Sequence, residues 1–154
     1  MKKYILGIFI VIIAVIGAFL INQGGEAPAD SFSVTLSVRV DALIDNMHLL
    51  DENKHELIPQ DGYIFPETIV TAYENDSVFD ILQREMRSNG IHMVVSGAGF
   101  VEGIGNIFMF DAGPMSGWLY MVNGQSADVG PSQYIVQPGD IIEWEFTIDF
   151  SEGW

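Results

Sequence analysis

The sequence predicts a small α+β domain in which one mixed β-sheet packs against a single amphipathic helix. Two segments, 32–40 and 141–148, alternate apolar and polar residues with a period of two, as half-buried strands do. Between them, residues 77–88 carry a helical pattern with one apolar face. Strands, then one helix, then further strands is the element order of a domain whose sheet packs its one helix against one face.

The first half of the domain is predicted to contain one long strand, a polar excursion and two short strands. The long strand, 32–40, places five apolar side chains on one face: Phe32, Val34, Leu36, Val38 and Val40. An acidic stretch, 43–62, follows and is expected to run along the domain edge. Two short strand-like runs, 63–65 and 69–73, are separated by Pro66, a residue expected at a strand end or bulge.

The helix has recognisable start and stop signals. Ser77 can cap the first turn together with Asp80, three residues later. Asn89 and Gly90 end the pattern. The apolar stripe that faces the sheet is formed by Val78, Ile81, Leu82 and Met86.

The second half is predicted to be a series of strands, at 91–96, 101–104, 107–110, 118–122, 134–136 and 141–148. Asn123 and Gly124 accept the positive φ values of a tight hairpin turn. A β-grasp-like arrangement fits this order, with the first and last long strands as parallel neighbours at the centre of the sheet. In the last strand, alternation buries Trp144 between Ile142 and Phe146.

An N-terminal apolar segment predicts export from the cytoplasm. Lys2 and Lys3 precede an uncharged run, 5–21, that is long enough to cross or nearly cross a bilayer. We therefore expect a transmembrane anchor or signal peptide at 1–22, a flexible stalk at 23–31 and the domain at 32–154. Retention as a single-pass anchor, with the domain outside the cell membrane, is favoured because the run is longer than a usual signal core. Cleavage near Ala29, which would give a secreted protein, is the alternative.

Charge and cysteine content exclude several function classes. All 21 acidic residues follow the apolar run, with only four of the six basic ones, so this part carries a formal charge of −17. Such a charge argues against a nucleic-acid partner and keeps the domain away from anionic lipid. The chain has no cysteine, which excludes disulfides, lipid-modified cysteine and thiolate chemistry.

The candidate chemical groups do not form a catalytic or metal motif. His48 and His55 are expected in solvent and His92 as a half-buried strand residue, and none stands in a hydrolase or metalloprotease pattern. The glycines at 97–105 lack the helix start and lysine of a phosphate loop. The carboxylates at 41–56 could bind a hard cation, but without calcium-loop spacing a solvated acidic surface is the better interpretation. We predict neither a catalytic nor a metal site.

A group of aromatic residues beside glycines is the sharper signal. Such residues can form an apolar wall with close backbone access, although alternation requires that some of them be plain core. Trp118, near a glycine-proline turn, is expected to be the more exposed tryptophan, and Trp144 the core one. The candidate ligand-binding residues are Trp118, Tyr120, Tyr134, Phe110, Gly117, Asn123 and Gly124.

Three segments resemble the transcobalamin-like C-terminal domain family of bacterial surface proteins. They are S-V-F-D-I-L at 77–82, G-W-L-Y-M-V-N-G at 117–124 and Y-I-V-Q-P-G-D-I-I-E-W at 134–144, within a resemblance that covers roughly 33–149. The family is similar to the corrinoid-binding C-terminal domain of animal transcobalamin and intrinsic factor. The resemblance implies a β-grasp variant displayed outside the cell, with cobalamin or a related corrinoid as candidate ligand. The helical domain that clamps the corrin in the animal proteins is not present in this sequence, and Ala112 stands in a segment where bacterial relatives often carry cysteine.

Together these observations predict a non-enzymatic ligand-binding module of the cell surface. A flat, partly apolar ligand would lie against Trp118, Tyr120 and Tyr134, with Asn123 and nearby backbone groups orienting it. The competing interpretation is a structural or adhesion module, in which the same aromatics form a core or bind another surface protein. No cofactor is predicted beyond the candidate corrinoid.

Overall fold

The computed structural model describes residues 30–152, so the predicted membrane segment, 1–22, and most of the stalk, 23–31, lie outside these residues. The chain divides into two compact units, 1–30 and 31–154, and every described helix and strand belongs to the second. Within the described residues, no helix has the length and apolar character needed to cross a bilayer.

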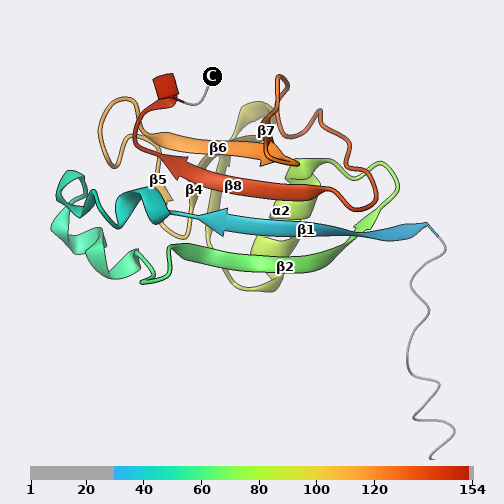
Figure 1. Cartoon of the computed structure of the whole chain (residues 1–154), viewed down its shortest axis with the longest axis horizontal. Coiled ribbons are helices and arrows are strands. Elements are labelled where there is room, and N and C mark those ends of the chain that lie inside the picture. Colours follow the sequence, from blue (N-terminus) through green and yellow to red (C-terminus); the bar gives the residue numbers. More distant parts are fainter. Residues whose placement is uncertain (1–29, 153–154) are drawn as a thin grey trace, which may run out of the picture. The chain divides into compact units, whose positions relative to one another are not determined.

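A mixed five-stranded sheet forms the main layer of the domain (Figure 1). Its strands are β1 (Ser31–Arg39), β2 (Tyr63–Tyr73), β6 (Gly117–Val122), β7 (Gln125–Ser126) and β8 (Ile141–Thr147). They lie in the order β2-β1-β8-β6-β7. β1 and β8 pair in parallel, from Thr35 opposite Ile141 to Arg39 opposite Glu145, whereas the other pairs are antiparallel. The predicted parallel pairing of the first and last long strands is therefore confirmed.

The single α-helix of the described residues, α2 (Val78–Ser88), packs on one face of this sheet. Ser77 accepts a hydrogen bond from the Asp80 amide, and Asp80 accepts one from the Ser77 amide, which completes the predicted capping box. Val78, Ile81, Leu82 and Met86 are fully buried, as their spacing predicts. Gly90, with φ +68°, follows the helix end.

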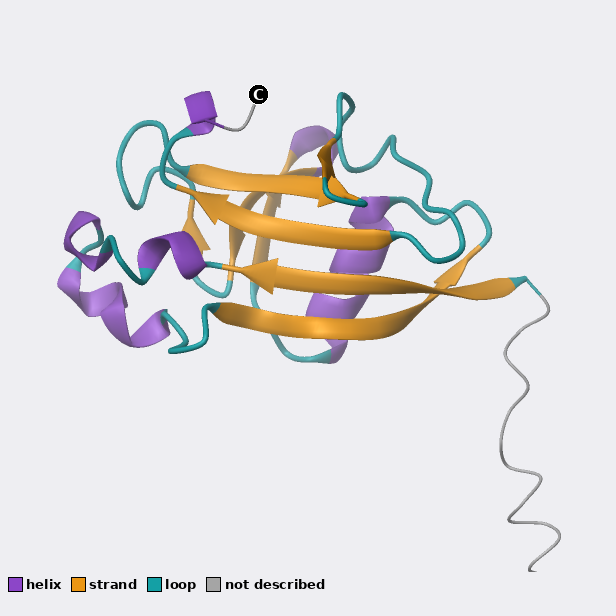
Figure 2. Ribbon diagram, viewed as in Figure 1, coloured by secondary structure: helices purple, strands orange, loops and turns teal. Residues whose placement is uncertain are grey.

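A second, three-stranded sheet lies beside α2 on the same face of the main sheet (Figure 2). It contains β3 (Met93–Ser96), β4 (Phe100–Ile104) and β5 (Ile107–Phe108), in that order and antiparallel. The prediction of one sheet was incomplete, because alternation identifies strands but does not identify their partners. Short 3-10 turns complete the unit: η1 (Asp41–Leu43), η2 (Met47–Leu49), η3 (Glu52–Leu57), η4 (Gly97–Gly99) and η5 (Phe150–Glu152).

Two predicted strand boundaries were wrong. The runs 63–65 and 69–73 form one edge strand, β2, and Pro66 lies where the register with β1 shifts between Leu36 and Val38. A bulge at an edge absorbs the missing proline N–H without ending the strand. Residues 134–136 form only an isolated bridge, Ile135 with Ser77, in place of a strand.

Candidate functional site

Trp118 is a core residue, which corrects the expectation that it would be partly exposed. Its side chain is 7% exposed, compared with 2% for Trp144. Its ring meets Phe146 edge to face at 5.4 Å, and its indole Nε1 donates a hydrogen bond to the Ile107 carbonyl at 3.0 Å. β6 has β8 and β7 on its two edges, and β4 of the small sheet packs against it, so this strand is not the exposed margin that the nearby glycine suggested.

Tyr120 links the core to the loop that follows β7. Its ring stacks on Trp144 at 5.3 Å, and Tyr134 meets it edge to face at 6.5 Å. Its hydroxyl donates to the Val129 carbonyl at 2.6 Å. Burial, with a smaller effect of Tyr134, raises the pKa of Tyr120 to about 12, so the hydroxyl stays a neutral donor at physiological pH. This hydrogen bond holds the loop after β7 close to the stacked rings of Tyr120 and Trp144.

A pocket of about 390 Å³ opens over these residues. Trp118, Tyr120 and Trp144 contribute to its lining from the inner face of the sheet. Phe100 of β4 and Phe150 of η5 contribute further aromatic surface. The remaining lining residues are Val101, Leu119, Ser126, Ala127, Asp128, Val129, Gly130 and Pro131. Its volume and aromatic lining fall within the range of small-molecule sites.

The structure brings Trp118 and Tyr120 into this pocket but not the other five predicted residues. Tyr134 reaches it only through its ring contact with Tyr120. Gly117 lies under the Phe150 ring, where an added Cβ would come within 2.5 Å of the ring carbon Cζ. The Phe150 side chain therefore fills the space beside the Gly117 backbone that was expected to be open to a ligand.

Asn123 and Gly124 stabilise the turn between β6 and β7 and do not line the pocket. They have φ values of 55° and 73°, as the tight turn between β6 and β7 requires. The side-chain Nδ2 of Asn123 donates to the Asp140 carboxylate at 2.9 Å, and its Oδ1 accepts from the Ile141 backbone amide at 3.0 Å. Asp140 is itself buried and also accepts from the Gln137 amide. The N-G and P-G-D parts of the motif thus hold the start of β8 against the β6–β7 turn.

Phe110 lies in the loop between β5 and β6, at a second hollow. Its side chain is 60% exposed, and its φ is +68°, a conformation that bulky residues rarely adopt. Its amide donates to the Ser116 carbonyl at 3.0 Å. The hollow beside it is lined by Phe100, Glu102, Phe108, Met109 and Phe110, so Phe100 contributes to both cavities.

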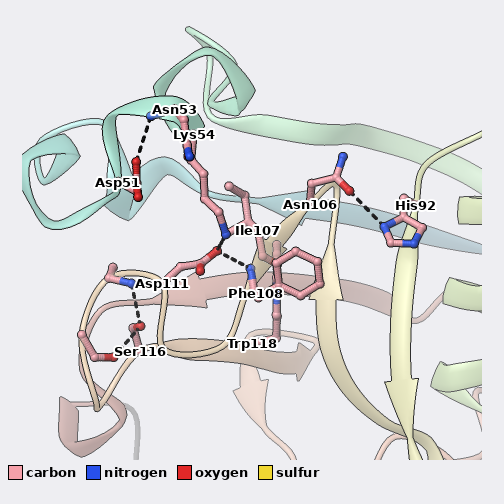
Figure 3. A network of polar contacts seen from close by, with 12 residues as sticks. Asp51, Asn53, Lys54, His92, Asn106, Ile107, Phe108, Asp111, Ser116 and Trp118 are labelled. Carbon is pink, nitrogen blue, oxygen red and sulfur yellow. Dashed lines mark hydrogen bonds and ion pairs between the residues drawn. The ribbon is translucent and has the colours of Figure 1, made fainter.

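A polar network holds this loop in place (Figure 3). Lys54, from η3, forms an ion pair with Asp111 and lies 4.9 Å from the centre of the Phe108 ring. Asp111 also accepts from the Phe108 amide at 2.7 Å. The Ser116 hydroxyl joins the two sides of the loop, because it accepts from Ala112 and donates to the Gly113 carbonyl.

Sequence reasoning missed eleven of the thirteen pocket residues, and the four aromatic or charged ones among them are Phe100, Asp128, Trp144 and Phe150. Trp144 was assigned correctly to the core, and a core residue can also line a cavity. The other three lie in short loops or at strand ends, where no periodicity indicates which way a side chain points. The nearness of Phe100 and Phe150 to glycines in the sequence was the available signal.

The histidines at 48, 55 and 92 take part in no metal-binding group within residues 30–152. His92 is exposed, in contrast to the half-buried position predicted for it, and its Nδ1 lies 3.0 Å from the Asn106 side-chain oxygen. No group of three or more His, Asp or Glu side chains in this part of the chain is arranged to hold a metal ion.

Fold and pocket define the unit as a small α+β domain with an aromatic cavity between its two sheets. Residues 75–147 match the family model described as "Domain of unknown function (DUF4430)". No curated protein matches the chain in sequence.

Among solved structures, the fold is similar to that of haptocorrin in its complex with Cbi. The TM-score is 0.55 at 16% sequence identity, over 82% of this chain and 27% of the haptocorrin chain. This likeness confirms the predicted transcobalamin-like fold. A protein from Ruminococcus gnavus ATCC 29149, proposed to bind metal, is also similar, with a TM-score of 0.44 and 15% identity over 75% of this chain and 96% of the other. A TM-score this low carries no argument about binding.

Proposed function

We propose that the chain is a non-enzymatic ligand-binding module displayed outside the cytoplasm, with a flat, partly apolar molecule as its ligand. The observation that carries the proposal is the 390 Å³ pocket with five aromatic side chains in its lining. Aromatic rings supply large contact area at low entropic cost, and the Tyr120–Val129 hydrogen bond keeps one wall of the pocket in place.

A corrinoid is the first ligand to test. Haptocorrin, whose fold is similar, was solved in complex with Cbi, a corrinoid. A corrinoid is larger than the drug-sized molecules that pockets of this volume enclose. Only part of it would therefore enter the pocket, and the rest would lie over the Phe100 side of the opening. The β-grasp relationship and the binding role are both part of this proposal.

Location outside the cytoplasm is proposed from the sequence. The apolar run 5–21 after two lysines, and the strongly acidic remainder, support a single-pass anchor. Membrane fractionation with N-terminal sequencing tests this part. A mature chain that begins at Asp30 and is free in the medium would replace the anchor with a cleaved signal peptide.

The ligand proposal is tested by adding a panel of corrinoids and other flat aromatic compounds to the purified chain. A ligand that binds only the folded state raises the melting temperature and changes tryptophan fluorescence. Phe100→Ala should weaken binding at least severalfold with little loss of stability, because this side chain lines the pocket yet is 51% exposed. Ile69→Ala is the matched control, since Ile69 is 75% exposed on β2 and does not line the pocket. Equal effects of the two changes would contradict the assignment of the pocket.

An adhesion or protein-interaction module is the second candidate, and Phe110 is the observation that favours it. An exposed aromatic side chain on a strained backbone, near Met115 at 48% exposure, is typical of a contact residue. Under this alternative, Phe110→Ser would abolish capture of a surface protein and leave small-molecule binding unchanged. Loss of small-molecule binding in Phe100→Ala alone would favour the ligand pocket.

A further inference from the structure

We propose that the aromatic pocket selects organic cations, namely ligands that carry an ammonium group on an apolar body. This inference rests on the proposed ligand-binding function and adds to it the charge of the preferred ligand. It depends on three features of the structure: the rings that line the pocket, the charged groups at its opening and the pairing of the basic residues elsewhere.

The aromatic lining attracts a cation more strongly than it attracts a neutral polar group. Five of the thirteen lining residues are aromatic, and the negative faces of such rings attract a positive charge within about 6 Å of the ring centre. The same domain already uses this contact twice, with Lys54 at 4.9 Å from the Phe108 ring centre and Arg84 at 5.2 Å from that of Tyr73. A positively charged ligand would make a third such contact.

Asp128 provides the complementary charge. It is the one ionisable acid or base in the lining apart from the Tyr120 hydroxyl, and no lysine, arginine or histidine lies beside it there. Its neighbour, Val129, is held by the Tyr120 hydroxyl, so the Asp128 backbone is positioned before a ligand arrives. A carboxylate at the rim of an aromatic pocket adds charge attraction to the cation–π contacts that recognise ammonium groups.

The charges of the rest of the domain strengthen this preference. Three of its four basic side chains are paired with carboxylates: Arg39 with Glu145, Lys54 with Asp111 and Arg84 with Asp76. The sequence carries a large acidic excess, and no lysine, arginine or histidine lines the pocket. Field lines of one sign concentrate in a cleft with apolar walls, which raises the local concentration of cations and repels anions.

The test compares choline with dimethylbutanol, a neutral isostere in which carbon replaces the charged nitrogen. Both are added to the full chain in an uncharged detergent, and binding is followed by tryptophan fluorescence and melting temperature. We expect choline to bind about tenfold more tightly than the isostere, the ratio that a cation–π contact of a desolvated ammonium group gives. The difference should shrink as salt is raised.

Two substitutions separate a local effect from a general one. Asp128→Asn should weaken choline binding severalfold and leave the isostere unchanged. Asp45→Asn, which removes the same charge from an exposed position outside the pocket, should change neither. Equal weakening in both variants would show attraction by net charge alone and would overturn the inference.

Failure of this inference is distinguishable from failure of the proposed function. Equal affinity for choline and its isostere, or no binding of either, overturns the preference for cations. A neutral corrinoid that binds and is lost in Phe100→Ala would still support the ligand pocket. If no compound of either panel binds, both proposals are overturned.

Discussion

The two buried tryptophans permit a matched test of one hydrogen bond. Trp118 and Trp144 lie on neighbouring strands, β6 and β8, and both are almost fully buried. The Trp118 indole donates to the Ile107 carbonyl, whereas the Trp144 Nε1 is buried without a partner among the described residues. Replacing each by phenylalanine removes the same atoms at both positions but breaks a hydrogen bond at only one.

The two variants should differ in stability by about 1–3 kcal/mol. Trp118→Phe leaves the Ile107 carbonyl without its indole donor, and a lost buried partner costs about 1–3 kcal/mol. Trp144→Phe removes an unsatisfied donor, so part of the packing loss is offset by relief of that desolvation cost. Both also lose ring contacts, Trp118 with Phe146 and Trp144 with Tyr120, and these losses are similar in kind.

Urea unfolding followed by far-UV circular dichroism measures the difference, because fluorescence would change with the loss of either indole. Thermal unfolding gives a second measure. A difference of 1 kcal/mol in the free energy of unfolding shifts the melting temperature of a domain of this size by roughly 4 °C, so Trp118→Phe should melt several degrees below Trp144→Phe. Equal costs would show that the Trp118 hydrogen bond contributes nothing net. A more costly Trp144→Phe would refute the reasoning and place a partner on its Nε1.

The remaining predictions concern one ionisation, one helix cap and one ion pair. The unfolded chain releases the Tyr120 proton at its ordinary pKa of 10.0 but the folded chain holds it to about 12, so stability falls as pH rises across that window. In Tyr120→Phe, the urea midpoint should show a smaller decline there than in the parent chain. Ser77→Ala removes the N-cap of α2 and should lower the free energy of unfolding by about 0.5–2 kcal/mol in urea. Lys54→Met leaves the Asp111 carboxylate without its cation and should speed amide exchange in the loop at 110–116, while exchange in α2 stays unchanged.

Periodicity predicted the parts of the fold that depend on which face of an element is buried. The last strand buries Ile142, Trp144 and Phe146 as alternation requires, and α2 buries its four apolar residues. The parallel pairing of β1 and β8 was predicted from the order of the elements, because a crossover through the helix allows β8 to return beside β1. These elements are long enough for the pattern to be unambiguous.

Short elements and partner choice were not accessible in the same way. Strands of two to five residues, such as β5 and β4, carry too few alternations to show which sheet they join. The candidate site depended on this unknown, since β4 of the small sheet packs against β6, the strand whose start was expected to be exposed. Trp118 is consequently both core and pocket residue, two roles that the sequence had presented as alternatives.

Gly117 shows how a motif residue can shape the pocket without lining it. Its backbone lies beneath the Phe150 ring and beside Met109, and a Cβ there would approach these side chains to 2.5 Å and 3.2 Å. Phe150, which does line the pocket, can therefore take its place only because residue 117 lacks a side chain. The Phe150 amide, in turn, donates to the Met115 carbonyl at 2.9 Å, which ties the C-terminal turn to the loop that begins β6. The glycine of the G-W-x-Y segment thus shapes the pocket through the aromatic ring packed on it, whereas the tryptophan and tyrosine of the segment line the pocket themselves.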